Sequence, residues 1–316
     1  MKRALGWLVL VLLVVVAGAG FYVYRNVHAM DVHELSEDLH VIMGLGSNVG
    51  VLKTQAGAVV VDTMTMASQG RKIRARVEEL TGGKAVAIIN THYHLDHTHG
   101  NPGFEPGTQV IATARTLQHL HDRDGDYWKG DAASLLPGRT FEKEELLDIG
   151  GKKIRCLHLG RGHTDGDLVV IFEDERVMHT GDLFFHNYFP NIDLEAGGSI
   201  KEWIATIDRL LELDVDRIIP GHGPVTDKEG LRKFQRFLVE LWEVGTAAAR
   251  DGKTLEETVR STRLKTAAGM EDIYVPFLIR LDHDFVVRRA WEEATGTVRA
   301  TAAAASGARS GEAVAR

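Results

Sequence analysis

Apolar and polar positions alternate in blocks along the chain, and these blocks predict strands and helices. Three short apolar runs separated by glycine-containing turns predict an antiparallel meander at residues 39–43, 49–54 and 58–62. A helix is predicted over about residues 67–80, and the continuous apolar run Ala85–Ile89 that follows it is typical of a buried strand. Further strands are predicted at 109–112, 146–149, 153–159, 168–172 and 176–180, with a helix at 114–122. The elements together predict two halves that each combine strands with helices.

The last third of the chain has helical periodicity. Leu, Phe and Trp side chains follow one stripe of the predicted helices at residues 200–213 and 230–250, so we expect that stripe to pack into the core. Two more helices are predicted at 254–260 and 274–294. Beyond Gly296 the chain is rich in Ala, Gly and Arg, which predicts a disordered tail at residues 297–316.

The N-terminal segment has a different character. Lys2 and Arg3 precede an uninterrupted apolar run from Ala4 to Tyr24, which as a helix would rise about 32 Å against about 30 Å of bilayer hydrocarbon. This predicts a membrane anchor at residues 1–25 and a main body on the exported, periplasmic or extracellular side. A cleaved signal is the alternative, because Ala17–Gly20 offers small residues after the apolar stretch. Residues 26–34 are predicted to be a linker, and 35–296 the folded domain.

Composition narrows the function. At 316 residues with 44% hydrophobic and 26% charged residues, the chain is long enough for one large domain or two small ones. The net charge of −7, without a basic stripe, argues against a nucleic-acid partner. Cys156 is the single cysteine, so the chain cannot form an internal disulfide. The 15 histidines matter more, because histidine is the commonest metal-binding side chain.

The stretch from Asn90 to Gly100 carries the strongest chemical signal. His92 and His94 are two residues apart just after a predicted strand, so in extended backbone both imidazoles point the same way and form a chelate. The polar residues that follow predict a helix start, which would direct Asp96 and His97 into the same cavity, where a second metal ion could bind.

Five more candidate residues lie at or soon after strand ends. His163, in the turn Gly160–Asp167, is predicted to be a third histidine for the first metal ion, and His222 lies in a stiff Pro-Gly-His-Gly-Pro loop. Asp182 has enough lone pairs to bridge two cations. Asp62 either braces a metal-binding loop from behind or caps the helix that begins near Met66. His186 is a candidate substrate contact because it closely follows Asp182.

These motifs, in this order, resemble the metallo-β-lactamase superfamily of metallohydrolases over about Val32 to Thr226. The resemblance implies a four-layered αβ/βα sandwich of the mixed α and β class, with the site at the edge between two β-sheets. It also implies a ligand set in which one metal ion binds His92, His94 and His163, the other binds Asp96, His97 and His222, and Asp182 bridges them.

The expected function follows from two such cations. A metal-bridging hydroxide held by Asp96 would attack an ester, thioester, lactone or amide bond of a small molecule. Zinc suits these ligands best, with iron or manganese as alternatives. A β-lactamase is an alternative function, although such enzymes carry Cys or Ser where this chain has Asp182. Another is a non-catalytic metal-binding or periplasmic redox-associated accessory protein. A further departure from the family is Asp165-Gly-Asp167 in place of the frequent Pro-Gly-Ser.

Overall fold

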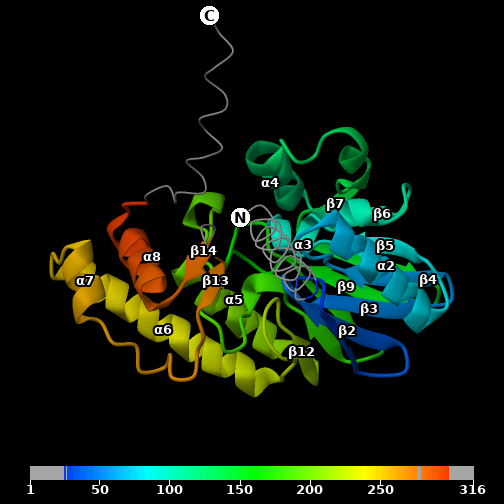
Figure 1. The fold of residues 1–316 in the computed structure, drawn as a ribbon. Helices are drawn as coiled ribbons and strands as arrows, with labels where there is room; N and C mark the ends of the chain where they lie inside the picture. Colours follow the sequence, from blue (N-terminus) through cyan, green and yellow to red (C-terminus); the bar gives the residue numbers. More distant parts are fainter. Residues whose placement is uncertain (1–24, 26, 276–278, 299–316) are drawn as a thin grey trace, which may run out of the picture.

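The computed structural model describes residues 25, 27–275 and 279–298. The anchor or signal predicted at the N-terminus and most of the tail predicted beyond residue 297 lie outside this part of the chain. Within the described residues, no helix combines the length and the apolarity that crossing a membrane requires. Figure 1 shows two packed sheets at the centre of the molecule, with helices on their outer faces.

The first sheet has seven strands in sequence order, and the predicted meander forms one side of it. Strands β1 to β4 pair antiparallel, whereas β4 to β7 pair in parallel. Parallel pairing needs a crossover, which helix α2 (Ala67–Thr81) supplies between β4 and β5. The strands are β1 (Met30–Glu34), β2 (Leu39–Gly44), β3 (Val49–Thr54), β4 (Gly57–Val61), β5 (Ala85–Ile89), β6 (Gln109–Thr113) and β7 (Arg139–Phe141).

The second sheet has five strands in the order β12-β11-β10-β9-β8. Its pairs are antiparallel except β11 with β12, which are parallel and joined through helix α5 (Ile200–Glu212). The strands are β8 (Glu144–Ile149), β9 (Lys152–Leu157), β10 (Val169–Phe172), β11 (Val177–His179) and β12 (Arg217–Ile219).

Side-chain alternation along the strands builds the layers. Val59 and Val61 of β4 belong to the apolar cluster between the two sheets, whereas Val60 belongs to the cluster under α2. In β10, Val170 faces the other sheet and Ile171 faces the helices on the outer side. The order is therefore helix, sheet, sheet, helix, which gives a mixed α and β sandwich.

The C-terminal helices cover the outer face of the second sheet. Helix α6 (Lys228–Arg250) packs along both α5 and α8 (His283–Thr295), as Figure 1 shows, and α7 (Leu255–Ser261) packs against α8. The predicted apolar stripe of α6, including Phe234 and Leu238, is buried in this layer.

Two sequence predictions are corrected by these elements. The linker predicted at residues 26–34 is wrong for β1, which pairs with β2 by backbone hydrogen bonds. Four of the five β1 side chains are exposed, so the strand has little apolar signal. The helix predicted over residues 274–294 begins only at His283, because Asp282 caps it by accepting a hydrogen bond from the Phe285 amide. Before it, β13 (Ile273–Val275) and β14 (Ile279–Leu281) form an antiparallel pair.

Cys156 provides a test of the inter-sheet core. Its side chain is fully buried, and burial raises the pKa of the thiol. We expect the native protein to react with a thiol reagent roughly 100-fold or more slowly than a free thiol, and the unfolded protein to react fully. Mass spectrometry after timed alkylation measures this, and rapid native labelling would contradict the packing of β9.

Candidate metal centre

All seven predicted ligands converge at one edge of the sandwich, and each lies in a loop or a short helical turn that follows a strand. Buried strand β5 leads through Asn90 into the His92–His97 loop, and α3 (Leu95–Thr98) begins directly after His94. The other three ligands follow strands of the second sheet. Because both sheets end at this edge, residues up to 130 positions apart in the sequence become neighbours.

The first group consists of His92, His94, His163 and Asp182. The Nδ1 atom of His94 lies 3.1 Å from His92 Nε2 and 2.7 Å from His163 Nε2. Asp182 Oδ2 lies 3.8 Å from His92 Nε2 and 3.6 Å from His163 Nε2. Three imidazole nitrogens and one carboxylate oxygen thus face a common centre, which is a set typical of a zinc site.

The second group consists of Asp96, His97 and His222, and Asp182 connects it to the first. The other carboxylate oxygen of Asp182, Oδ1, lies 3.1 Å from His97 Nε2 and 3.2 Å from His222 Nε2. Asp96 Oδ2 lies 3.3 Å from His222 Nε2. The Asp182 carboxylate therefore presents one oxygen to each group, as a bridging ligand would.

Two buried atoms indicate that the protein alone does not complete this arrangement. His97 Nε2 and Asp182 Oδ1 are among the few buried side-chain atoms of the described residues that make no hydrogen bond. An unpaired buried polar atom costs free energy, and a cation between these two atoms would satisfy both. The donor set therefore fits two divalent cations.

Electrostatics keep the carboxylates charged. Burial alone would raise the pKa of Asp182, but the neighbouring His222 and His97 lower it well below the ordinary value. For Asp96 the same two histidines outweigh burial and lower the pKa. His163 is held neutral, because burial and His94 lower its pKa to about 4. Ionised carboxylates and a neutral imidazole are the forms that bind metal.

Asp62 has the contacts of a brace. Its carboxylate accepts hydrogen bonds from His97 Nδ1 at 2.7 Å and from the amide and hydroxyl of Thr91, both at 2.8 Å. Helix α2 begins after Met66 without a side-chain cap, so Asp62 does not cap it. Because His97 Nδ1 is the donor to Asp62, its Nε2 atom is the ring nitrogen that faces the second group.

A segment that the sequence analysis missed braces the first group. His94 Nε2 donates to Asp193 Oδ2 at 3.0 Å, and His163 Nδ1 donates to the Asn191 carbonyl at 2.8 Å. Tyr93 also donates to Asp193, at 2.5 Å. We call Asn191–Gly197 the bracing segment. No motif marks it in the sequence, because a single Asp and a backbone carbonyl have no spacing signature.

Close approach of two loops requires glycine at Gly221. A Cβ atom there would lie 2.0 Å from Asp182 Oδ1 and 2.7 Å from the Gly181 carbonyl carbon. Asn48 holds this loop, because its side-chain amide donates to the Pro220 and Gly223 carbonyls. Absence of a side chain at Gly221 thus lets His222 and Asp182 share one centre.

Asp165 and Asp167 have separate structural roles. Asp165 accepts from His119 Nε2 at 2.6 Å and from Arg115 Nε at 2.8 Å, which ties helix α4 (Ala114–Asp124) to the His163 turn. Asp167 is buried and accepts from both the amide and the hydroxyl of Thr164. The two acids therefore stabilise the turn and lie outside both ligand groups.

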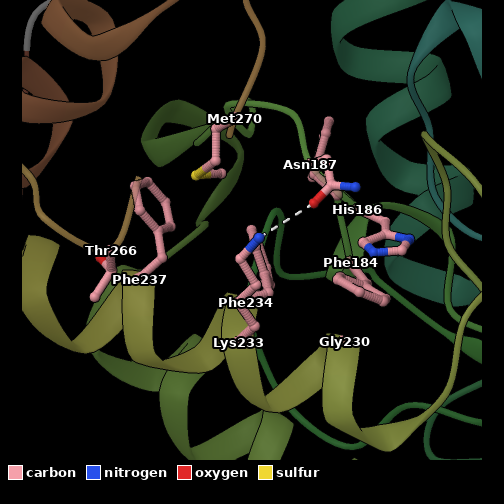
Figure 2. Close-up of a pocket in the computed structure, with 10 residues that line it drawn as sticks. Phe184, His186, Asn187, Gly230, Lys233, Phe234, Phe237, Thr266 and Met270 are labelled. Carbon is pink, nitrogen blue, oxygen red and sulfur yellow. Dashed lines mark hydrogen bonds between the residues drawn. The ribbon is translucent and has the colours of Figure 1, made fainter. Parts of the chain in front are cut away.

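His186 lies outside both groups. Its backbone amide donates to the His222 carbonyl, but its ring points to the Pro224 carbonyl, 2.7 Å from Nδ1. Figure 2 shows it lining an apolar crevice along α6 with Phe184, near the Lys233–Asn187 hydrogen bond. Contact of His186 with substrate stays a prediction.

Comparison with known proteins gives a family match. The model of the metallo-beta-lactamase superfamily matches residues 42–222. The alpha subunit of the 2,4-dinitroanisole O-demethylase of Nocardioides sp. is 30% identical over 210 residues, covering 64% of this chain and 60% of that protein. The linear primary-alkylsulfatase of a Pseudomonas species is 24% identical over 276 residues, covering 72% of this chain and 51% of that protein. The chain thus spans about half to three fifths of these two relatives.

Solved structures agree on the fold. The sec-alkylsulfatase Pisa1 from Pseudomonas sp. superposes with a TM-score of 0.66 and 16% identity, covering 85% of this chain and 51% of that chain. The metallo-beta-lactamase from Pontibacter korlensis superposes with a TM-score of 0.58 and 22% identity, covering 67% of this chain and 99% of that chain.

Replacement of a shared ligand tests the centre. We expect the purified protein to bind about two equivalents of zinc, one for each group. Asp182→Asn should weaken zinc binding at both groups by roughly 100-fold, because it removes the charge that both share. Elemental analysis and chelator competition measure this, with His121→Ala on the exposed face of α4 as the control. Unchanged zinc content in Asp182→Asn would contradict the ligand assignment.

The buried carboxyl group of Asp167 should make the unfolding free energy depend on pH. Burial raises its pKa to about 7 despite the two hydrogen bonds from Thr164, against about 3.9 in an unfolded chain. The folded state therefore binds the proton more tightly, and this contribution to stability is complete below about pH 4 and is lost as the pH rises to about 7. For metal-free protein, we expect the unfolding free energy of wild type relative to Asp167→Asn to fall from pH 5 to pH 7. Equal pH profiles for the two proteins would contradict the shift.

Proposed function

We propose that this chain, which belongs to the metallo-beta-lactamase superfamily, is a hydrolase with two divalent metal ions. The observation that carries the proposal is the Asp182 carboxylate, which directs one oxygen to each of two ligand groups. A non-catalytic accessory protein would have no need of both complete groups. Zinc is the metal we propose, because imidazole and carboxylate ligands suit it.

Two bound divalent cations would bring the pKa of a water molecule to near neutrality and polarise the bond to be cleaved. His92, His94, His163 and Asp182 would hold one cation, and Asp96, His97, His222 and Asp182 the other. Asp96 is the ligand with the most exposed side chain, at 30%, so it faces the side from which substrate enters. Its carboxylate is ionised at neutral pH, because His97 and His222 lower its pKa against the effect of burial. We assign it the role of holding and later moving the proton of the attacking water.

Two exposed leucines belong to the segments around Asp96. Leu95, between ligands His94 and Asp96, has 50% of its surface exposed, and Leu45 has 54% exposed in the loop whose Ser47 amide donates to the Asp96 carbonyl. Exposed leucines beside a metal centre favour a small-molecule substrate with an apolar group. An ester, thioester, lactone or amide with such a group is the substrate class we propose.

A second candidate is cleavage of a sulfate ester or an aryl methyl ether. Two relatives are named for such substrates, an alkylsulfatase and a dinitroanisole O-demethylase subunit. The likeness to the sec-alkylsulfatase covers 85% of this chain, against 67% for the Pontibacter korlensis enzyme. Hydrolysis of β-lactams is the third candidate, and it is the least favoured because Asp182 occupies the bridging position.

For location, we propose a membrane-anchored protein with its metal centre on the exported side. The apolar run Ala4–Tyr24 and the preceding Lys2 and Arg3 support this proposal. Release after cleavage of a signal is the alternative.

A turnover screen tests the function. The zinc-loaded full chain in detergent would be assayed with a lactone, a thioester, a β-lactam, an alkyl sulfate, an aryl methyl ether and a phosphodiester. We expect turnover of at least one carboxylic or sulfate ester, and a loss of about 100-fold or more in His94→Ala, because a ligand is removed. His121→Ala is the control with wild-type turnover. Full turnover by metal-free protein would contradict the mechanism.

A further inference from the structure

The two ligand groups are braced from different parts of the molecule. His97 of the second group is held by Asp62, at the end of β4 in the first sheet. His94 and His163 of the first group are held by the bracing segment Asn191–Gly197. The second brace is a loop, so its position depends on whatever holds that loop.

Helix α8 holds the bracing segment through Arg289. The Arg289 side chain is 1% exposed, and its Nε atom donates to the Ile192 carbonyl at 2.8 Å. Its two terminal nitrogens donate to the Glu195 carboxylate, and Nη1 also donates to Glu292 Oε2 at 2.8 Å. One guanidinium therefore bonds both a backbone carbonyl and a side chain of the bracing segment.

We propose that Arg289 is a positioning residue for the first metal ion, acting through the bracing segment on His94 and His163. This inference rests on the proposed two-metal centre. Ile192 lies between Asn191, whose carbonyl accepts from His163, and Asp193, whose carboxylate accepts from His94. A shift of Ile192 would therefore move both acceptors together.

The chemistry of arginine explains why this position needs it. A guanidinium presents five N–H donors in a rigid planar fork, whereas a lysine ammonium presents three donors on one atom. Lysine cannot reach the Ile192 carbonyl, Glu195 and Glu292 at once. Without Arg289, Glu292 would also lose its buried cation, since its side chain is 1% exposed.

Neighbouring contacts show that α8 holds this region over more than one residue. Glu293 accepts from the Ser199 hydroxyl at 2.6 Å and the Ile200 amide at 2.7 Å, just beyond the bracing segment. On the opposite side, Arg123 of α4 donates to the Glu195 carbonyl. The family model ends at residue 222, so α8 is an addition to the matched region that reaches back to it.

The test measures zinc affinity at each group separately. In a His222→Ala background the first group keeps all its ligands, and in a His163→Ala background the second group keeps all of its own. Competition with a chromophoric chelator gives the zinc dissociation constant in each. We expect Arg289→Lys to weaken the first group about 10-fold to 100-fold, the range for loss of a group that orients a ligand. The second group should change less than about 2-fold.

Val287→Ala is the matched control. Val287 is buried in α8 within the apolar cluster that also contains Ile192, so its truncation leaves a cavity there but removes none of the hydrogen bonds that Arg289 makes to the bracing segment. It should lower the melting temperature and leave both dissociation constants unchanged. If Arg289→Lys fails to fold, Glu195→Gln serves instead, because it removes one charged partner of Arg289 and should weaken the first group selectively by a smaller factor.

The positioning role would be overturned if Arg289→Lys weakened zinc binding equally at both groups. It would also be overturned if neither Arg289→Lys nor Glu195→Gln weakened zinc binding at the first group. Zinc content and turnover of the wild-type protein test the proposed function separately. A wild type that binds two zinc ions and turns over substrate, with an Arg289→Lys variant that loses neither group selectively, would leave the function standing and reject this inference.

Discussion

A buried carboxylate shared by four imidazoles is the constraint on which the rest of the structure depends. Asp182 is 4% exposed, and burying a lone charge of this kind is costly unless opposite charge or donors surround it. Loops from both sheets supply those partners, and each must end at the same edge of the sandwich. The order of the strands, the tight turn at Gly221 and the braces behind the histidines all serve that convergence.

Much of this could be predicted from the sequence, for clear physical reasons. Residues that bind metal through a chelate have fixed spacings, as in His92-x-His94, and buried strands such as β5 are continuous apolar runs. Braces have no such signature. Asp193 and Arg289 act through single contacts made only after folding, and a carbonyl such as that of Asn191 is present in every residue. Strand β1 was missed because backbone bonds hold it while its side chains face solvent.

The residues that brace the two ligand groups come from different parts of the molecule. His97 depends on Asp62 and Thr91, which follow strands β4 and β5 of the first sheet. His94 and His163 depend on a loop held between α4 and α8. Residues at the ends of sheet strands therefore support one group, and a loop bonded to two helices supports the other. A dinuclear centre on such a scaffold would have metal sites with different mechanical surroundings, even though they share Asp182.

The absence of a side chain at Gly221 has a consequence for protein engineering. Because any Cβ there would clash with Asp182 and the Gly181 backbone, Gly221 cannot be replaced by another residue unless the loop shifts. Leu95, by contrast, stands between the ligands His94 and Asp96 in the sequence, Leu45 belongs to the loop whose Ser47 amide donates to the Asp96 carbonyl, and at least half of the surface of each leucine is exposed. A library of variants can therefore change Leu45 and Leu95 without a steric clash, while Gly221 must remain glycine.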